Sequence, residues 1–337
     1  MIYPVFLPHA GCPFKCIYCN QQVVVSHGRR ASDILEFVES ALRAYSKQIC
    51  KSGRSGEIAF FGGTFSALPL ALIESILAAV TIPVRQGIFT GIRFSTRPDC
   101  LGGEVLDLLS RYSIRTVELG VQSLSDSVLQ ESRRGYCVKS VYDAARLVRD
   151  KGWKLGIQLM AGLPGDTQGV FFESMGKAIE IEPDFLRIYP TLVLAGTDLA
   201  DSFRNGIYNP LSLDEALTWI VPAFDLALRA GIPVIRMGLQ PDAALEKPGV
   251  ILAGPYHPAF GCLVKCRWWR ERVDEHFASF PLLRGCHIVL LVSPNQVGDV
   301  IGHGKSNVRH WKARWGISAK VIGGAGLAGT EMIVENN

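Results

Sequence analysis

The sequence predicts an α/β protein with a partial (β/α)6 barrel of the TIM type, followed by a small C-terminal α/β domain. Two observations lead to this prediction. Short apolar segments rich in β-branched and aromatic residues alternate with helical patterns over about the first 240 residues. Polar or glycine-rich residues follow the predicted strands one after another. Because ligands bind at the carboxyl ends of parallel strands, these residues should share one rim of the sheet.

The predicted strands are apolar segments bounded by Gly or Pro, at residues 3–7, 57–61, 87–94, 115–120, 154–160 and 185–189. Helical patterns lie between them at 32–51, 68–79, 104–111, 138–151 and 168–181. A further helix at 213–230 has Asp214 and Glu215 in its first turn and Gly231 after its end. Residues 234–237 are predicted as one more strand. An open doubly wound sheet has the same spacing and stays the alternative.

Beyond the barrel the pattern changes twice. Residues 240–284 contain many Pro and Gly and no clear period, and we interpret them as a bridging segment. From residue 285 a second pattern predicts strands at 287–292, 317–322 and 331–335, with helices at 297–301 and 306–315. The expected domains are therefore 1–239 for the barrel, 240–284 for the bridge and 285–337 for the small α/β domain.

Composition indicates a well-cored globular protein, since 48% of the 337 residues are hydrophobic and 20% are charged. No uninterrupted apolar run is long enough for a membrane span, and the N-terminus lacks a basic leader, so we expect a cytoplasmic protein without a membrane partner. Charge is uneven: residues 1–249 hold 25 Lys and Arg against 25 Asp and Glu, whereas residues 250–337 hold 10 against 6. This basic end is expected to meet a polyanion or to be a solvated basic face.

Three of the nine cysteines lie within eight residues, directly after the first predicted strand: Cys12, Cys16 and Cys19. Soft thiolates at this spacing can surround one metal centre. Four cysteines usually hold an iron–sulfur cube, so three would leave one iron open to a substrate or cofactor. The alternative is a zinc site completed by His9 or Cys262, although the paired spacing typical of zinc knuckles is missing.

The other cysteines carry a weaker signal. Cys262 and Cys266 form a looser pair, and a separation of four residues is too little by itself to predict an auxiliary cluster. The remaining four are scattered and are expected to be small buried hydrophobes: Cys50, Cys100, Cys137 and Cys286.

The Cys-x3-Cys-x2-Cys spacing, with the aromatic Tyr18 before the last cysteine, resembles the radical S-adenosylmethionine (SAM) superfamily over residues 1 to about 240. The resemblance implies a radical SAM barrel and a catalytic [4Fe–4S] cluster on Cys12, Cys16 and Cys19, with Phe14 and Tyr18 in the cofactor-binding loop. It also implies that SAM chelates the open iron and is cleaved reductively to methionine and a 5′-deoxyadenosyl radical. A reductant protein of the flavodoxin or ferredoxin type would then be a partner.

Further rim segments resemble the SAM-binding elements of that superfamily. Gly62-Gly63-Thr64 stands where relatives hold the methionyl amine, and adjacent glycines allow close backbone approach, although a plain tight turn has the same pattern. Ser95, in the same segment as Arg97, replaces an acidic residue that would contact the ribose.

Three later strand ends complete the pocket that the resemblance implies. Gln122 is expected to contact the ribose or methionine, and Gln158 and Gly162 should close over the adenine. Arg134 aligns with an arginine that pairs with the methionyl carboxylate, which a planar guanidinium can hold with two hydrogen bonds. A solvated surface position is the alternative for Arg134.

Within the superfamily the sequence resembles the catalytic subunit of Elongator and its bacterial relatives, in the segments 61–69, 96–99, 118–123, 134–139 and 189–197. This resemblance implies an RNA substrate, with tRNA as the leading candidate. Two departures put acetyl-CoA-dependent chemistry in doubt: the cysteine spacing is the short one, and no segment is left for an acetyltransferase domain.

The basic end offers a separate clue. Gly302-His303-Gly304-Lys305 resembles the Gly-x-x-Gly loop of KH domains, which clamps a nucleic-acid backbone, with Lys305 in place of the second Gly. Lys305 and Arg309 are candidate phosphate contacts. The alternative is a small α/β accessory domain without RNA.

Two other functions stay open. The oxygen-independent coproporphyrinogen oxidases share the Gly-Val-Gln-Ser and Gly-Leu-Pro elements, so a porphyrin decarboxylase is the second enzymatic reading. A non-catalytic carrier of a cluster or haem could retain the same fold.

Overall fold

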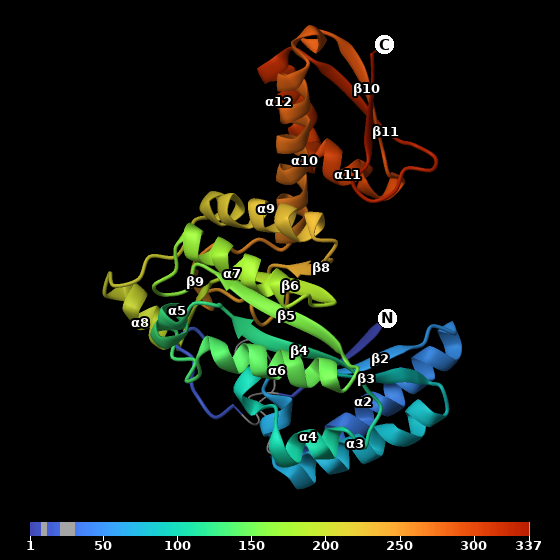
Figure 1. Cartoon of the computed structure of the whole chain (residues 1–337), viewed down its shortest axis with the longest axis vertical. Helices are drawn as coiled ribbons and strands as arrows, with labels where there is room; N and C mark the ends of the chain where they lie inside the picture. The colour runs from blue at the N-terminus through green and yellow to red at the C-terminus, as the bar shows by residue number, and fades with distance from the viewer. Residues whose placement is uncertain (8–11, 21–30, 337) are drawn as a thin grey trace. The chain divides into compact units, whose positions relative to one another are not determined.

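The computed structural model describes residues 1–7, 12–20 and 31–336 (Figure 1). The chain divides into two compact units. The N-terminal unit comprises Met1–Ala216 with Leu226–Tyr256, and the C-terminal unit comprises Leu217–Asp225 with His257–Asn337. The expected division at residues 239 and 284 stays a prediction. In the described part of the chain, no helix has the length and apolar character needed to cross a membrane.

Seven parallel strands form the main sheet of the N-terminal unit, in the order in which they occur along the chain. They are β1 (Ile2–Phe6), β2 (Gly56–Phe61), β3 (Phe89–Thr96), β4 (Ile114–Gln122), β5 (Lys154–Ala161), β6 (Phe185–Pro190) and β8 (Val234–Met237). Each pairs with its neighbour in parallel. A doubly wound sheet would reverse direction in its strand order, and this one does not. The sheet is a curled half-barrel, which confirms the predicted fold class.

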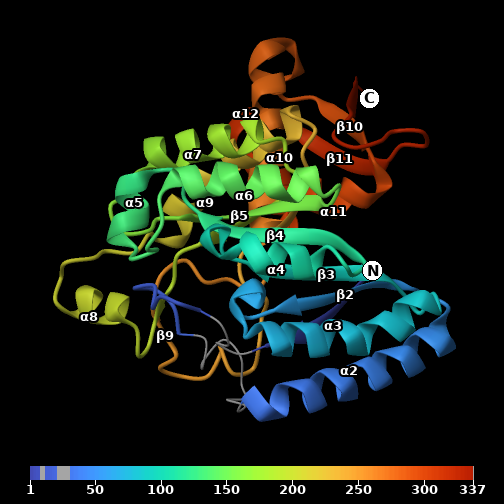
Figure 2. The same cartoon turned by 60° about the horizontal axis from the view of Figure 1, so that its bottom comes forward.

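Helices run along this sheet in Figures 1 and 2. They are α2 (Ala31–Ser52), α3 (Leu70–Arg85), α4 (Gly103–Leu109), α5 (Asp126–Glu131), α6 (Val138–Asp150) and α7 (Gln168–Glu180). Two more helices follow in the chain, α8 (Asp198–Arg204) and α9 (Leu213–Arg229), and residues Leu217–Asp225 of α9 belong to the C-terminal unit. Strand β4 shows how the core is built: Val117, Leu119 and Val121 are fully buried on one face, while Glu118 and Gln122 lie on the other. The apolar face packs on the helices, and the polar face lines the inside of the half-barrel.

A short antiparallel pair, β7 (Val193–Leu194) and β9 (Ile251–Ala253), lies outside the main sheet in the same unit. Strand β7 belongs to a small apolar cluster in which Ile17, between two of the predicted cysteine ligands, packs with Val193 and Leu199. The backbone N–H of Leu199 donates to the carbonyl of Ile17 at 2.9 Å. These contacts anchor the cysteine loop to the protein framework.

The C-terminal unit is a small α/β domain. It contains α10 (Phe260–Ser279), β10 (His287–Val292), α11 (Val297–Ile301), α12 (Ser306–Trp315), β11 (Ser318–Gly323) and β12 (Met332–Asn336). Strand β10 lies in the middle, parallel to β11 and antiparallel to β12. Trp269, Phe277 and Trp311 are fully buried in its core. The strands and the two short helices lie close to their predicted positions.

Helix α10 was not predicted from the sequence. Its buried residues are spread around the helix rather than along one stripe: Phe260, Val264, Cys266, Trp268, Trp269, Val273 and Phe277. An apolar period is seen only when one face of a helix is buried, so basic and aromatic residues interleaved around α10 concealed it.

Candidate functional site

The three N-terminal cysteines lie on a loop after β1, at the rim where the strands end. Cys16 is buried, whereas Cys12 and Cys19 are partly exposed. The backbone N–H of Cys19 donates to the carbonyl of Cys16 at 3.1 Å, which closes a turn. The Cys12 sulfur lies 3.2 Å from the hydroxyl of Thr64, in the loop after β2. Of the predicted cofactor contacts, Thr64 is thus held directly against a candidate metal ligand.

Arg134 places a buried guanidinium beside this loop. Its Nη1 donates to the Cys16 sulfur at 3.1 Å and to the Tyr18 hydroxyl at 3.2 Å. Its Nη2 donates to the carbonyl of Gly120, at the end of β4, at 2.5 Å, and to the Tyr136 hydroxyl at 3.0 Å. The side chain therefore joins the cysteine loop to the rim of the sheet. It is 5% exposed, so it is not a solvated surface arginine.

Burial works against the charge of Arg134, but Tyr18, Tyr136 and Cys16 outweigh it and raise its pKa well above the usual value. Arg134 therefore stays protonated. Burial also raises the pKa of the Tyr18 hydroxyl, against the opposing effect of Arg134, so this tyrosine stays neutral. The fixed charge next to the Cys16 sulfur is thus a positive one.

A second buried guanidinium, that of Arg97, approaches the same sulfur. Two of its nitrogens bind the carboxylate of Asp99 at 2.9 Å each. Its Nη1 lies 3.9 Å from the Cys16 sulfur, and its planar group lies over the rings of Phe14 and Tyr136, at 5.0 and 5.1 Å from their centres. Two cations therefore flank Cys16, which favours an anionic group at this position.

Gln122 has a strained backbone at the end of β4. Its φ of 71° lies in the left-handed region, and the pairing with β5 shifts register between Gly120 and Gln122. A Cβ on Gly120 would lie 3.0 Å from the Gln122 side-chain nitrogen and 3.8 Å from Nη2 of Arg134. Gln122 and Arg134 are thus brought together over Gly120. Strain of this kind costs about 1–3 kcal/mol and is often found at functional sites.

The glycines after β2 allow close approach of the first two strand ends. Gly62 has a φ of 97°, and a Cβ there would lie 3.1 Å from the carbonyl oxygen of Leu7. A small hollow lies beside this contact, lined by Leu7, Phe60, Phe61, Gly63, Thr64, Phe65, Leu68 and Ser95. The structure therefore brings Gly63, Thr64 and Ser95 to one place.

A row of paired charges, buried at Arg93 and Glu118 and half-buried at Glu57 and Arg187, crosses the polar face of the sheet below this rim. We call it the charge ladder, formed by Glu57 on β2, Arg93 on β3, Glu118 on β4 and Arg187 on β6. Arg93 binds Glu57 at 2.7 Å and Glu118 at 2.9 Å, and Arg187 donates to Glu118 at 3.0 Å. Glu118 is fully buried. One signal in the sequence could have indicated the ladder: charged residues such as Arg93 and Arg187 stand inside strands that are otherwise largely apolar.

The ladder also determines where Gln158 lies. The side-chain nitrogen of Gln158 donates to Glu118 at 3.0 Å and lies 3.5 Å from the Ser95 hydroxyl. Gln158 and Ser95 are therefore neighbours of each other and of the ladder. Both are predicted cofactor contacts, and the hydrogen bond to Glu118 in the charge ladder holds the Gln158 side chain next to Ser95.

Gly162 lies in the loop after β5, and the Asp166 carboxylate accepts backbone hydrogen bonds within this loop. The N–H of Gly162 donates to the Asp166 carboxylate at 3.0 Å, and its carbonyl accepts from the Tyr208 hydroxyl at 2.6 Å. Burial raises the pKa of Asp166 to about 6, although backbone hydrogen bonds from Gly162, Thr167 and Leu163 oppose the shift. No pattern in the sequence indicated a role for this carboxyl group.

The candidate RNA contacts lie in the C-terminal unit and form a separate group. Gly302, His303, Gly304 and Lys305 make the loop between α11 and α12, and Arg309 lies on α12. Lys305 has a left-handed φ of 63°, and both Lys305 and Arg309 are exposed. His9, named above as a possible zinc ligand, lies outside the described residues.

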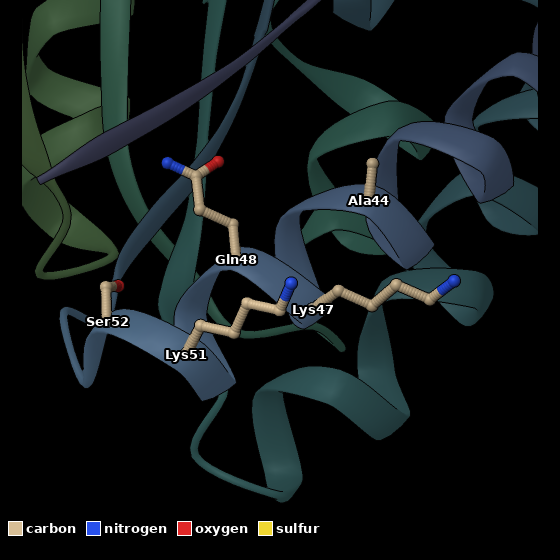
Figure 3. Close-up of a pocket in the computed structure, with 5 residues that line it drawn as sticks. All are labelled: Ala44, Lys47, Gln48, Lys51 and Ser52. Atoms are coloured by element: carbon tan, nitrogen blue, oxygen red, sulfur yellow. The ribbon is translucent and has the colours of Figure 1, made fainter.

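A further hollow lies along α2, and Figure 3 labels the residues that line it. All its lining residues come from this one helix: Ala44, Lys47, Gln48, Lys51 and Ser52. None of the predicted site residues lines it. We therefore assign it no role in the chemistry.

Two family models match the chain. The model of the Radical SAM superfamily matches residues 6–175, and that of the Radical_SAM C-terminal domain matches residues 183–270. The first match spans the cysteine loop and β2 to β5, and the second includes β6 to α9.

Curated relatives resemble parts of the chain. A tRNA uridine(34) acetyltransferase of Methanocaldococcus jannaschii is 33% identical over 125 residues, which cover 36% of this chain and 23% of that protein. Elongator complex protein 3 of Homo sapiens is 30% identical over 225 residues, covering 58% of this chain and 41% of that protein. The matched regions thus span well under half of these relatives.

Among solved structures, that of archaeal Elp3 from Methanocaldococcus infernus superposes with a TM-score of 0.60. The superposition covers 81% of this chain and 63% of the other, at 22% sequence identity. At this identity the likeness establishes a shared fold.

Proposed function

This chain belongs to the radical SAM superfamily and is a radical SAM enzyme, and from this premise we propose that Cys12, Cys16 and Cys19 hold the [4Fe–4S] cluster that the family implies. We further propose that the enzyme acts on RNA, with tRNA as the leading candidate. The observation that carries the first proposal is the cysteine loop with two guanidiniums at the Cys16 sulfur.

The donor set fits the cluster. Thiolates are the usual ligands of iron–sulfur clusters, and three of them leave one iron for SAM. When bound, the cluster supplies the electron that cleaves SAM to methionine and a 5′-deoxyadenosyl radical. Arg134 and Arg97 offset negative charge at Cys16, because each brings a fixed cation within 4 Å of its sulfur. Burial of Cys16 limits the access of water to this ligand.

We assign SAM binding to the strand ends around that loop. Gly62, Gly63 and Thr64 would hold the methionyl amine, with Ser95 and Gln122 toward the ribose and Gln158 and Gly162 toward the adenine. The contact between Thr64 and Cys12 and the proximity of Gln122 to Arg134 support this placement. Arg134 is proposed to turn its guanidinium toward the methionyl carboxylate while its Nη2 stays on Gly120. Fixed hydrogen-bond donors of this kind orient a substrate before the reaction.

RNA as the substrate rests on two observations. The two curated relatives are named as a tRNA uridine(34) acetyltransferase and as an Elongator protein. Residues 250–337 carry the excess positive charge of the chain, and the loop that resembles the KH element presents exposed Lys305, with Arg309 exposed four residues further along. We propose that these two side chains contact phosphates, as a glycine loop between two helices does in KH domains.

The radical chemistry is tested with reconstituted, anaerobic protein. We expect 5′-deoxyadenosine to form from SAM after reduction with dithionite, measured by liquid chromatography with mass spectrometry. The Cys16→Ala variant should form none. If the wild-type protein also forms none while its cluster is intact by electron paramagnetic resonance (EPR), the chain is a carrier rather than an initiator.

The RNA substrate is tested separately, by tRNA retention on filters at low salt and by nucleoside mass spectrometry of tRNA incubated with the active enzyme. We expect retention and a new modified nucleoside that requires SAM. Formation of 5′-deoxyadenosine without retention of RNA would remove RNA from the proposal and leave the radical chemistry intact.

A further inference from the structure

The C-terminal unit contains a second group of potential metal ligands, remote in sequence from the first. Cys262 and Cys266 lie one turn apart on α10, and Asp299 lies on α11. The two sulfurs are 3.8 Å apart, and the Cys262 sulfur is 3.8 Å from the Asp299 carboxylate. All three donor atoms lie within 4.8 Å of one another, and among the described residues no other three histidine, cysteine or acidic residues form such a group.

These distances suit a single ion. With Zn–S bonds of about 2.3 Å in tetrahedral geometry, two thiolate sulfurs on one zinc lie roughly 3.8 Å apart. A thiolate sulfur and a carboxylate oxygen on the same zinc lie roughly 3.6 Å apart by the same geometry. A hydrogen bond between two thiols explains the first distance alone. A hydrogen bond from the Cys262 thiol to Asp299 explains the second distance, but neither bond requires the Cys266 sulfur to lie within 4.8 Å of the carboxylate as well.

The framework around the group is rigid. The buried side chain of Asn307 donates to the carbonyl of Cys266 at 2.8 Å and to that of Val300, the residue after Asp299, at 3.0 Å. It therefore fixes the turn that carries Cys266 against the helix that carries Asp299. The backbone N–H of His303 also donates to the Cys266 sulfur. Hydrogen bonds from the surrounding shell are the usual means of orienting metal ligands.

We propose that Cys262, Cys266 and Asp299 bind one divalent transition-metal ion, with zinc as the leading candidate. A fourth coordination position would be open to solvent or to a ligand. Two thiolates and a carboxylate are donors that zinc accepts, whereas magnesium and calcium prefer oxygen alone. Cys262 is exposed, so the ion has a route of entry. Lys265 lies near Asp299 and offsets part of the remaining negative charge.

The test uses the full chain with Cys12, Cys16 and Cys19 all changed to Ser, so that the N-terminal loop cannot bind metal. After removal of metal under reducing conditions, we expect one equivalent of Zn²⁺ to bind, measured by competition with a chromophoric chelator. Co²⁺ should give a thiolate-to-cobalt absorption band and tetrahedral ligand-field bands. In the same background, Cys262→Ser and Asp299→Asn should each lower zinc affinity at least tenfold, with Cys286→Ser as the matched control.

Three results would overturn the proposal. The first is zinc affinity unchanged by Cys262→Ser in a variant that retains its circular dichroism spectrum. The second is bound Co²⁺ with an octahedral spectrum and no thiolate band. The third is a mass two hydrogens lower under mild oxidation, together with no zinc uptake by the reduced chain, which would show that Cys262 and Cys266 form a redox pair.

Discussion

The sulfur of Cys16 lies 3.1 Å from a guanidinium nitrogen of Arg134, whereas the sulfur of Cys262 lies 3.8 Å from a carboxylate oxygen of Asp299. The same side chain therefore stands in opposite electrostatic surroundings in the two units. Fixed cations beside a thiolate suit an anionic cluster that also receives the carboxylate of SAM. A carboxylate beside two thiols suits a bare divalent cation. The charges around the cysteines therefore distinguish the two proposed metal centres better than the cysteine spacing does.

The contrast extends to the rest of each unit. In the N-terminal unit, the charges of the ladder are paired inside the sheet, as Glu118 is with Arg93 and Arg187. In the C-terminal unit, Lys305 and Arg309 are exposed on a loop and a short helix. Buried pairs fix geometry, and exposed cations attract a polyanion from solution. The four predictions below test this contrast, from the largest expected effect to the smallest.

The largest effect is expected for Glu118→Gln. This change removes a buried charge shared by buried Arg93 and half-buried Arg187, and breaking a buried pair costs about 3–5 kcal/mol. The free energy of unfolding, measured by urea denaturation, should fall by that amount. Glu173→Gln breaks the exposed pair with Lys177 and serves as the control, with an expected change under about 1 kcal/mol. Equal losses in the two variants would show that burial does not set the strength of the ladder.

The next effect concerns Arg134. Arg134→Met removes the hydrogen bond to the Cys16 sulfur, and hydrogen bonds to cysteine sulfurs help to set cluster potentials. We expect a lower midpoint potential in an EPR-monitored redox titration. Formation of 5′-deoxyadenosine should be about a hundredfold slower, which is the order of loss found when one preorganised hydrogen-bond donor is removed from an active site. Arg133→Met changes an exposed neighbour that pairs with Asp198, and it should leave both values near those of the wild type. An unchanged potential in Arg134→Met would contradict the electrostatic role of this arginine.

A smaller effect is expected for RNA binding. Lys305→Gln with Arg309→Gln should weaken tRNA binding about tenfold in low salt. It should also reduce the slope of log affinity against log salt by about 1.5, because two phosphate contacts are lost. Lys320→Gln, another exposed cation of this unit, is the control. Equal weakening by Lys320→Gln would indicate a diffuse basic face rather than a binding loop.

The smallest effect is a pH dependence from Asp166, whose pKa of about 6 lies above its ordinary value of 3.8. The folded state binds this proton more tightly than the unfolded chain, so the stability of the wild type should fall as pH rises from about 4 through 6. Asp166→Asn cannot ionise, so its stability relative to the wild type should rise as pH increases from 4 to 7. Thermal midpoints at a series of pH values measure this difference. Parallel curves for the two proteins would contradict the raised pKa.

Local patterns predicted most elements of the fold. Strand β8 was predicted with the bounds that the structure shows, and the half-barrel followed from the alternation of strands and helices. Helix α10 was missed because it is buried on several sides, and β7 with β9 because a pair of two or three residues has no detectable period. Pairing of such short strands depends on contacts between distant parts of the chain.

The sequence suggested a set of candidate site residues but not the network that joins them. Spacing singled out Cys16 as a candidate, and position after a strand singled out Gln122. The hydrogen bond from Arg134 to Cys16 spans 118 residues, and the ladder joins four strands. No local pattern specifies which buried cation meets which anion, because that choice is made by the register of the sheet. The convergence of Asp299 on Cys262 is of the same kind.

The charge ladder has a consequence for how this sequence can vary. Each of its members pairs with an opposite charge on another strand of the sheet, so losing Arg93 or Glu118 leaves partners in the ladder unbalanced. Positions 57, 93, 118 and 187 are therefore expected to change together among descendants of a common ancestor. Homologues should carry the whole set or replace it with apolar residues as a block, and intermediates with a single unpaired charge should be rare.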